Sequence, residues 1–156
     1  MENKASEIIH LEPFQVIGIA IRTTNENLQS KQDIEILWGR FFAENVLSKI
    51  PNKVSGTIYC IYTDYEKDHS APYTTIIGCK VNATENIPEG MVLKEIPATK
   101  YLVFTCVGKM PDAVLDTWLY IWKSDIERKY VADFEVYDEK SQDPVNAEVK
   151  TYLSVI

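Results

Sequence analysis

Hydrophobic residues in the first half of the chain follow two different periods. The segment Phe14–Thr23 (FQVIGIAIRT) is apolar and β-branched, which predicts a strand. From about residue 31 to residue 50, apolar side chains recur at i, i+3, i+4 and i+7, which predicts an amphipathic helix ended by Pro51. Two further apolar runs, at residues 56–63 and 73–81, are predicted to be strands.

The same order of elements restarts after a Pro- and Gly-containing break at residues 86–90. The pattern there predicts an extended segment, a strand, a helix and two more strands at about residues 91–96, 100–108, 111–126, 134–138 and 147–155. Pro111 suits the first turn of the second helix, because its missing N–H has no partner there in any case. The whole chain is therefore predicted to repeat a strand–helix–strand–strand unit.

The two predicted helices match in detail, with Trp38 and Trp118 at equivalent positions. We therefore predict an α+β fold in one domain over residues 1–156, built from duplicated βαββ modules at about 8–84 and 88–156. A pseudo-twofold pairing of the modules would give an antiparallel sheet with two helices and a central groove. Junctions of this kind are where ligands tend to bind.

The strand around Phe134 carries a carboxylate among aromatic and β-branched residues. Because strand neighbours point to opposite faces, Glu135 and Tyr137 share one face, and Phe134 and Val136 share the other. If Phe134 and Val136 face the core and the other face is open to solvent, Glu135 simply faces water. If both faces are covered, Glu135 is a buried charge that needs a partner such as the Tyr137 hydroxyl, or a raised pKa.

Composition and charge narrow the classes of function. The net charge of −7 argues against a nucleic-acid-binding surface, which needs clustered Lys and Arg. No run of apolar residues is long enough for a signal peptide or a membrane span, so a cytoplasmic protein without membrane contact is expected. Three cysteines (Cys60, Cys79 and Cys106) lie in apolar runs without metal-binding spacing, and no metal or other cofactor is expected.

Five loose motifs occur in a fixed order from Phe14 to the C-terminus. They are IEILW at Ile34–Trp38, IYCIY at Ile58–Tyr62, YTTIIGCKV at Tyr73–Val81, IPATKYLVF at Ile96–Phe104 and DFEVY at Asp133–Tyr137. Together they resemble a GyrI-like small-molecule-binding domain, which also forms the effector-binding part of AraC-type and multidrug-responsive transcription regulators. One departure is Thr75, which stands where the third motif usually has a second aromatic residue.

The resemblance implies a groove that takes hydrophobic, often cationic, drug-like molecules. In the family, an acidic residue in this groove faces the positive charge of the ligand, and the matching residue here is Glu135. The resemblance also implies that Trp118, Tyr59 and Tyr101 form aromatic walls of the groove. Aromatic rings attract cations through their quadrupole. The hydroxyl expected to donate a hydrogen bond to Glu135 is that of Tyr137, two residues further along the strand. Effector binding or sequestration, possible links to transcription regulation, and an amphipathic or cationic small-molecule partner are therefore expected.

Two other functions are compatible with the same residues. A desolvated Glu135 with the Tyr137 hydroxyl could serve as general base and acid in a hydrolase of electrophilic small molecules. Alternatively, the domain could inhibit a protein partner, and its negative charge would suit a basic surface. In the transcription regulators of the GyrI-like family, this domain is fused to a helix-turn-helix segment. The present sequence leaves no residues for such a segment, so direct DNA binding is not expected.

Overall fold

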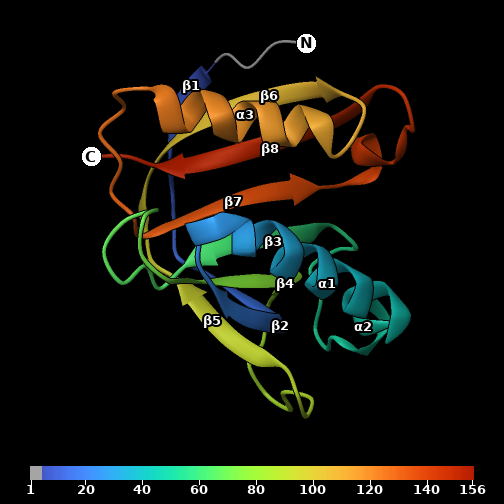
Figure 1. Ribbon diagram of the computed structural model, residues 1–156. Coiled ribbons are helices and arrows are strands. Elements are labelled where there is room, and N and C mark those ends of the chain that lie inside the picture. The colour runs from blue at the N-terminus through green and yellow to red at the C-terminus, as the bar shows by residue number, and fades with distance from the viewer. Residues whose placement is uncertain (1–4) are drawn as a thin grey trace.

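The computed structural model describes the backbone of residues 5–156 and the side chains of residues 7–156, in which eight strands form one antiparallel sheet (Figure 1). The strands are β1 (Ala5–Leu11), β2 (Phe14–Thr23), β3 (Ile58–Thr63), β4 (Tyr73–Val81), β5 (Val92–Ile96), β6 (Thr99–Gly108), β7 (Ala132–Tyr137) and β8 (Ala147–Ser154). The α-helices are α1 (Gln29–Ala43), α2 (Val46–Lys49) and α3 (Asp112–Lys123), and short 3-10 turns cover Glu26–Leu28 and Glu139–Gln142.

The strand order β1-β6-β8-β7-β3-β4-β2-β5 is that of a duplicated unit. The repeats β2-α1-β3-β4 and β6-α3-β7-β8 meet at the central β3–β7 pair. Strand β1, which precedes the first repeat, pairs with β6 of the second repeat. Strand β5, which precedes the second repeat, pairs with β2 of the first. The predicted α+β fold with duplicated βαββ modules is thus confirmed.

Both long helices pack on one face of this sheet (Figure 1). Leu37 and Phe41 of α1 are buried over the first repeat, and Val114 and Ile121 of α3 are buried over the second. Their i, i+4 and i, i+7 spacing is the apolar stripe that the sequence showed, so burial of that stripe stabilises each helix on its own half-sheet.

The opposite face of the sheet is also buried, because the sheet curls. Only two residues, Glu12 and Pro13, join β1 to β2, although these strands stand six positions apart in the sheet. In a flat sheet the strands would lie roughly 29 Å apart, whereas three Cα–Cα steps reach about 11 Å. The two ends must therefore approach each other, and they enclose a core that includes Ile61, Tyr101 and Phe134.

The predicted helix at residues 31–50 is two helices. Asn45 adopts a left-handed conformation (φ 53°), which ends α1 and starts the four-residue α2. Asn tolerates this conformation better than most residues. Val46 and Ile50 remain buried beyond the break, which explains why the apolar period continued through it. Strand β1 was not predicted, because an edge strand with polar residues such as His10 gives a weak pattern.

Gly18 of β2 and Gly78 of β4 face each other where the two backbones come very close. A Cβ atom on Gly18 would lie 2.2 Å from the carbonyl oxygen of Ile77, and one on Gly78 would lie 2.2 Å from that of Ile17. Only glycine therefore fits at these two paired positions of β2 and β4.

Candidate functional site

Glu135 lies at the centre of the sheet on the face that carries both helices. Its neighbours Phe134 and Val136 point into the core on the other face, as strand alternation requires. The carboxylate side chain is only 2% exposed. Of the two possibilities left by the sequence, the structure therefore shows the buried charge and not the water-facing one.

Three neutral donors surround the Glu135 carboxylate. The Tyr62 hydroxyl on β3 and the Trp118 Nε1–H on α3 each donate to Oε2 at 2.7 Å. The Tyr137 hydroxyl, two residues on along β7, donates to Oε1 at 2.5 Å. Donors from both repeats therefore converge on one acid.

The electrostatics of Glu135 follow from burial and these contacts. Removal from water raises the pKa of the carboxyl above its usual value, and hydrogen bonds from Tyr137, Tyr62 and Trp118 oppose that shift. Within the part of the chain whose side chains are described, no lysine, arginine or histidine forms an ion pair with Glu135. A buried carboxylate held only by neutral donors is an unusual arrangement, because buried charges are normally paired.

Asp133 shows the paired arrangement two residues earlier on the same strand face. It is fully buried, and Arg128 Nη2 donates to its Oδ2 at 2.9 Å. The hydroxyl of Tyr65 also donates to Oδ2, while the backbone N–H of Ser154 donates to Oδ1 at 2.8 Å. The protein therefore supplies its own cation to Asp133 but not to Glu135.

Aromatic rings from both helices border Glu135. Trp118 meets Tyr62 edge-on at a centroid distance of 5.4 Å, and Trp38 of α1 meets Tyr137 edge-on at 5.1 Å. Trp38 also stacks on Phe42, whose side chain is 64% exposed. A series of touching rings thus connects the solvent to the buried acid.

The structure brings some of the predicted site residues together and separates others. Trp118 and Tyr137 contact Glu135 directly. Tyr59 and Tyr101 lie on the opposite face, where their rings pack on Phe134 at 5.8 and 5.2 Å. The register explains this, because Tyr59 pairs with Val136 and so shares its face.

Tyr62 and Arg128 contribute to the site without having been singled out as site residues. Tyr62 shares the face of Cys60, and Cys60 pairs directly with Glu135, so knowledge of the β3–β7 register would have selected Tyr62 instead of Tyr59. Arg128 comes from the segment between α3 and β7, and no periodicity in the sequence indicates where its side chain lies.

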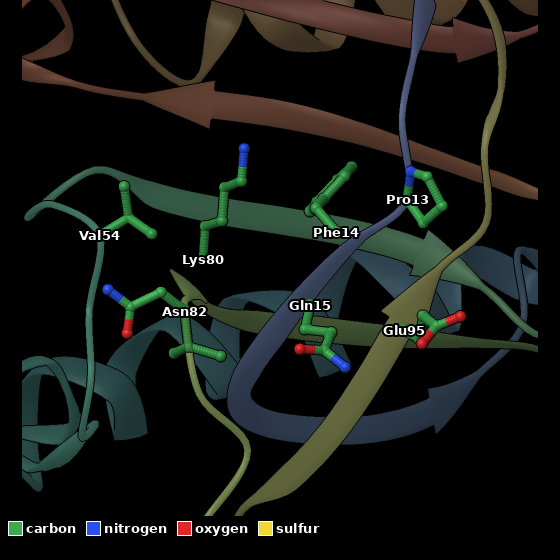
Figure 2. A pocket seen from close by; sticks show the side chains of 8 residues that line it. Pro13, Phe14, Gln15, Val54, Lys80, Asn82 and Glu95 are labelled. Carbon is green, nitrogen blue, oxygen red and sulfur yellow. The ribbon is translucent and has the colours of Figure 1, made fainter.

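A surface pocket of about 360 Å³ lies elsewhere, at the β2–β4–β5 end of the sheet (Figure 2). Lys80 Nζ lies 5.4 Å from the centroid of the Phe14 ring there. The pocket is lined by Pro13, Phe14, Gln15, Val54, Lys80, Val81, Asn82 and Glu95. None of these is a predicted site residue, so the chemistry around Glu135 is separate from this pocket.

Neither metal-binding clusters nor membrane-spanning helices occur in the described part of the chain. No group of three or more His, Cys, Asp or Glu side chains there is placed to hold a metal ion. No described helix combines the length and apolar character needed to cross a bilayer. The three cysteines are free and buried.

Comparison with known proteins gives a consistent assignment. A family described as Cass2, integron-associated effector binding protein, matches residues 7–155. The integron cassette protein VCH_CASS2 from the mobile metagenome of Vibrio cholerae is 27% identical, with a TM-score of 0.75 over 98% of this chain and 97% of its own. The putative transcriptional regulator protein YobU of Bacillus subtilis (strain 168) is 28% identical over 96% of this chain and 97% of its own length.

A third protein resembles this chain in its fold alone. The structure of SAV2435 bound to tetraphenylphosphonium superposes with a TM-score of 0.80 over 96% of this chain and 93% of that chain, at 18% identity. These matches confirm the GyrI-like effector-binding fold that the sequence motifs indicated.

Proposed function

Because the chain belongs to the integron-associated effector binding protein family, we propose that it binds amphipathic organic cations between its two long helices. In this proposal Glu135 neutralises the positive charge of the ligand. Trp118, Tyr62 and Tyr137 hold the carboxylate and present their rings to the ligand.

The difference between Glu135 and Asp133 carries the proposal. Both acids are buried on one face of β7, and Arg128 pairs with Asp133. Glu135 has hydrogen bonds but no counter-charge among the described residues, so desolvation of its charged form is only partly offset. A ligand cation placed beside Glu135 would supply what Arg128 supplies to its neighbour.

The surrounding rings suit an organic cation better than a hydrated metal ion. An aromatic face attracts a cation by about 0.5–2 kcal/mol, more when water is excluded. Rings also bury the apolar substituents of the ligand without requiring a fixed hydrogen-bond pattern. Recognition by one charge and several rings therefore favours a class of flat or bulky cations over a single compound.

Two known proteins, one similar in fold and one in sequence, support this class of ligand and this type of role. SAV2435 is bound to tetraphenylphosphonium, a bulky aromatic cation, and it shares this fold. YobU is a putative transcriptional regulator of similar length. We infer that the present chain acts in the cytoplasm as an effector-binding or sequestering protein with a role in transcription regulation.

The proposal is tested by replacing the charge while keeping the shape. In Glu135→Gln, affinity for tetraphenylphosphonium should fall about 10- to 100-fold, the range expected for a hydrogen-bonded buried charge. Affinity for the neutral probe triphenylphosphine oxide should change much less. Isothermal titration calorimetry measures both, and Glu139→Gln is the matched control because Glu139 is exposed.

Equal losses for the cation and the neutral probe would reject charge-based recognition. A Glu135→Gln protein that binds the cation normally but no longer hydrolyses a reactive electrophile would instead assign Glu135 to catalysis as a general base.

A further inference from the structure

Arg128 uses only part of its hydrogen-bonding capacity. Its side chain is 6% exposed in the ion pair with Asp133, and one nitrogen, Nη2, donates to that carboxylate. The other two nitrogens, Nε and Nη1, are buried and have no acceptor among the described residues. Buried donors of this kind are rare in native proteins, because a buried N–H without an acceptor costs free energy.

Two aromatic rings lie close to the Arg128 guanidinium. The guanidinium carbon of Arg128 lies 4.3 Å from the Tyr130 ring centroid and 5.8 Å from that of Trp118. A ring face is a weaker partner for a guanidinium than an oxygen atom, especially a charged one. Tyr130 also has a left-handed backbone (φ 57°), which is unfavourable for a bulky residue.

Trp118 joins this cation to the proposed ligand site. Its Nε1–H donates to Glu135, and its ring lies beside Arg128. Asp133 and Glu135, the acids on either side, are two residues apart on one strand face, which corresponds to roughly 7 Å. Trp118 therefore contacts both a carboxylate without a counter-charge and a guanidinium with unused donors.

We propose that Arg128 forms a second subsite that binds an anionic or strongly accepting oxygen of the ligand, while Glu135 binds its cationic group. The preferred ligands would be zwitterionic aromatic molecules, such as an organic cation that also carries a carboxylate. This inference rests on the proposed function, because it assigns the second half of the same site.

A ring series from the surface covers the Arg128 subsite. Tyr130 receives the guanidinium on one side, and His69 lies against it at 6.2 Å with Nδ1 3.0 Å from its hydroxyl. Trp122 stacks on the outer side of His69 at 6.5 Å and is 43% exposed. Displacement of Tyr130 and His69 would open a route from the solvent to Nε and Nη1.

The test uses rhodamine B, which has a free carboxylate, and its ethyl ester, which has the same cation without it. At pH 7.5 the unmodified protein should bind rhodamine B at least about tenfold more tightly, as measured by fluorescence anisotropy. The net charge of −7 works against this result, because it favours the ester. Equal affinities, or a preference for the ester, would overturn the inference without any variant being needed.

A double variant then locates the preference. Arg128→Met with Asp133→Asn removes both charges together, so no unpaired buried charge remains and the net charge is unchanged. The ratio of the two affinities should fall to about one. Arg40→Met with Glu44→Gln, which removes an exposed ion pair at the C-terminal end of α1, is the control and should keep the original ratio.

Each outcome separates the two proposals. A preference that survives in the folded double variant overturns the Arg128 subsite and leaves Glu135-based binding intact. Binding of tetraphenylphosphonium without binding of either dye also overturns the subsite. If neither the dyes nor tetraphenylphosphonium bind the unmodified protein, the proposed function fails and the inference fails with it.

Discussion

Cys60 and Glu135 face each other across the central β3–β7 pair, at equivalent places in the two repeats. Each is followed two residues later by a tyrosine, and the hydroxyls of both tyrosines, Tyr62 and Tyr137, donate to Glu135. Burial raises the pKa of the Cys60 thiol well above its usual value, which keeps it neutral. The duplication thus places one charge at its symmetry centre and surrounds it with donors from both halves.

The two equivalent tryptophans should respond differently to the same substitution. Trp118→Phe keeps an aromatic ring but removes the N–H that Glu135 Oε2 accepts, and we expect the free energy of unfolding to fall by about 1–3 kcal/mol at neutral pH. Part of any loss in unfolding free energy comes from the smaller size of the Phe ring. Trp38→Phe measures that part, because Trp38 occupies the equivalent position in the first repeat. Urea unfolding of both variants checks this, and an equal loss would show that the hydrogen bond to Glu135 contributes nothing.

The tyrosines on the two faces of the sheet should also differ. Tyr101→Phe removes a buried hydroxyl that has no hydrogen-bond partner in the described structure, so stability should stay the same or rise by up to about 1 kcal/mol. Tyr137→Phe removes a donor to Glu135 and should destabilise the protein while weakening cation binding. Calorimetric titration with tetraphenylphosphonium distinguishes them, since a loss of affinity in Tyr101→Phe would return that residue to the ligand-binding site.

Two glycine-to-alanine changes test the fold itself. In α1, Gly39 has open space around it, so Gly39→Ala should stabilise the helix by about 1 kcal/mol. Gly18→Ala would place a methyl group 2.2 Å from the Ile77 carbonyl oxygen, and we expect it to destabilise the protein by several kcal/mol or to prevent folding. Thermal unfolding monitored by circular dichroism measures both, and a folded Gly18→Ala protein of unchanged stability would contradict the close β2–β4 approach.

The sequence was sufficient for the fold because local periodicity and duplication carry that information. Strand and helix periods located both repeats, and the matching positions of Trp38 and Trp118 indicated their symmetry. The break at Asn45 was missed because the apolar pattern continues through it. The exchange of β1 and β5 between repeats depends on long-range pairing, which no local pattern encodes.

The site was only partly predictable, because it depends on strand register. Alternation within β7 correctly grouped Glu135 with Tyr137, since both lie in one local segment. The choice among tyrosines of another strand requires its register against β7, and a shift of one residue exchanges Tyr59 for Tyr62. Arg128 lies outside any regular element, so its position beside Trp118 follows only from the folded chain.

The buried state of Glu135 predicts opposite pH dependences for stability and for ligand binding. Because burial raises its pKa above the usual 4.5, the folded protein binds a proton more tightly than the unfolded chain does. The contribution of Glu135 to stability is then fully present below about pH 4.5 and is lost as the pH rises through the raised value. Cation affinity should instead increase over the same pH range, as the carboxylate forms. Glu135→Gln should remove both effects, and subtracting its unfolding free energy at each pH cancels the other titrating groups. A difference curve with the opposite slope would show that the pKa is lowered, which would mean that the three hydrogen bonds to the carboxylate outweigh its desolvation.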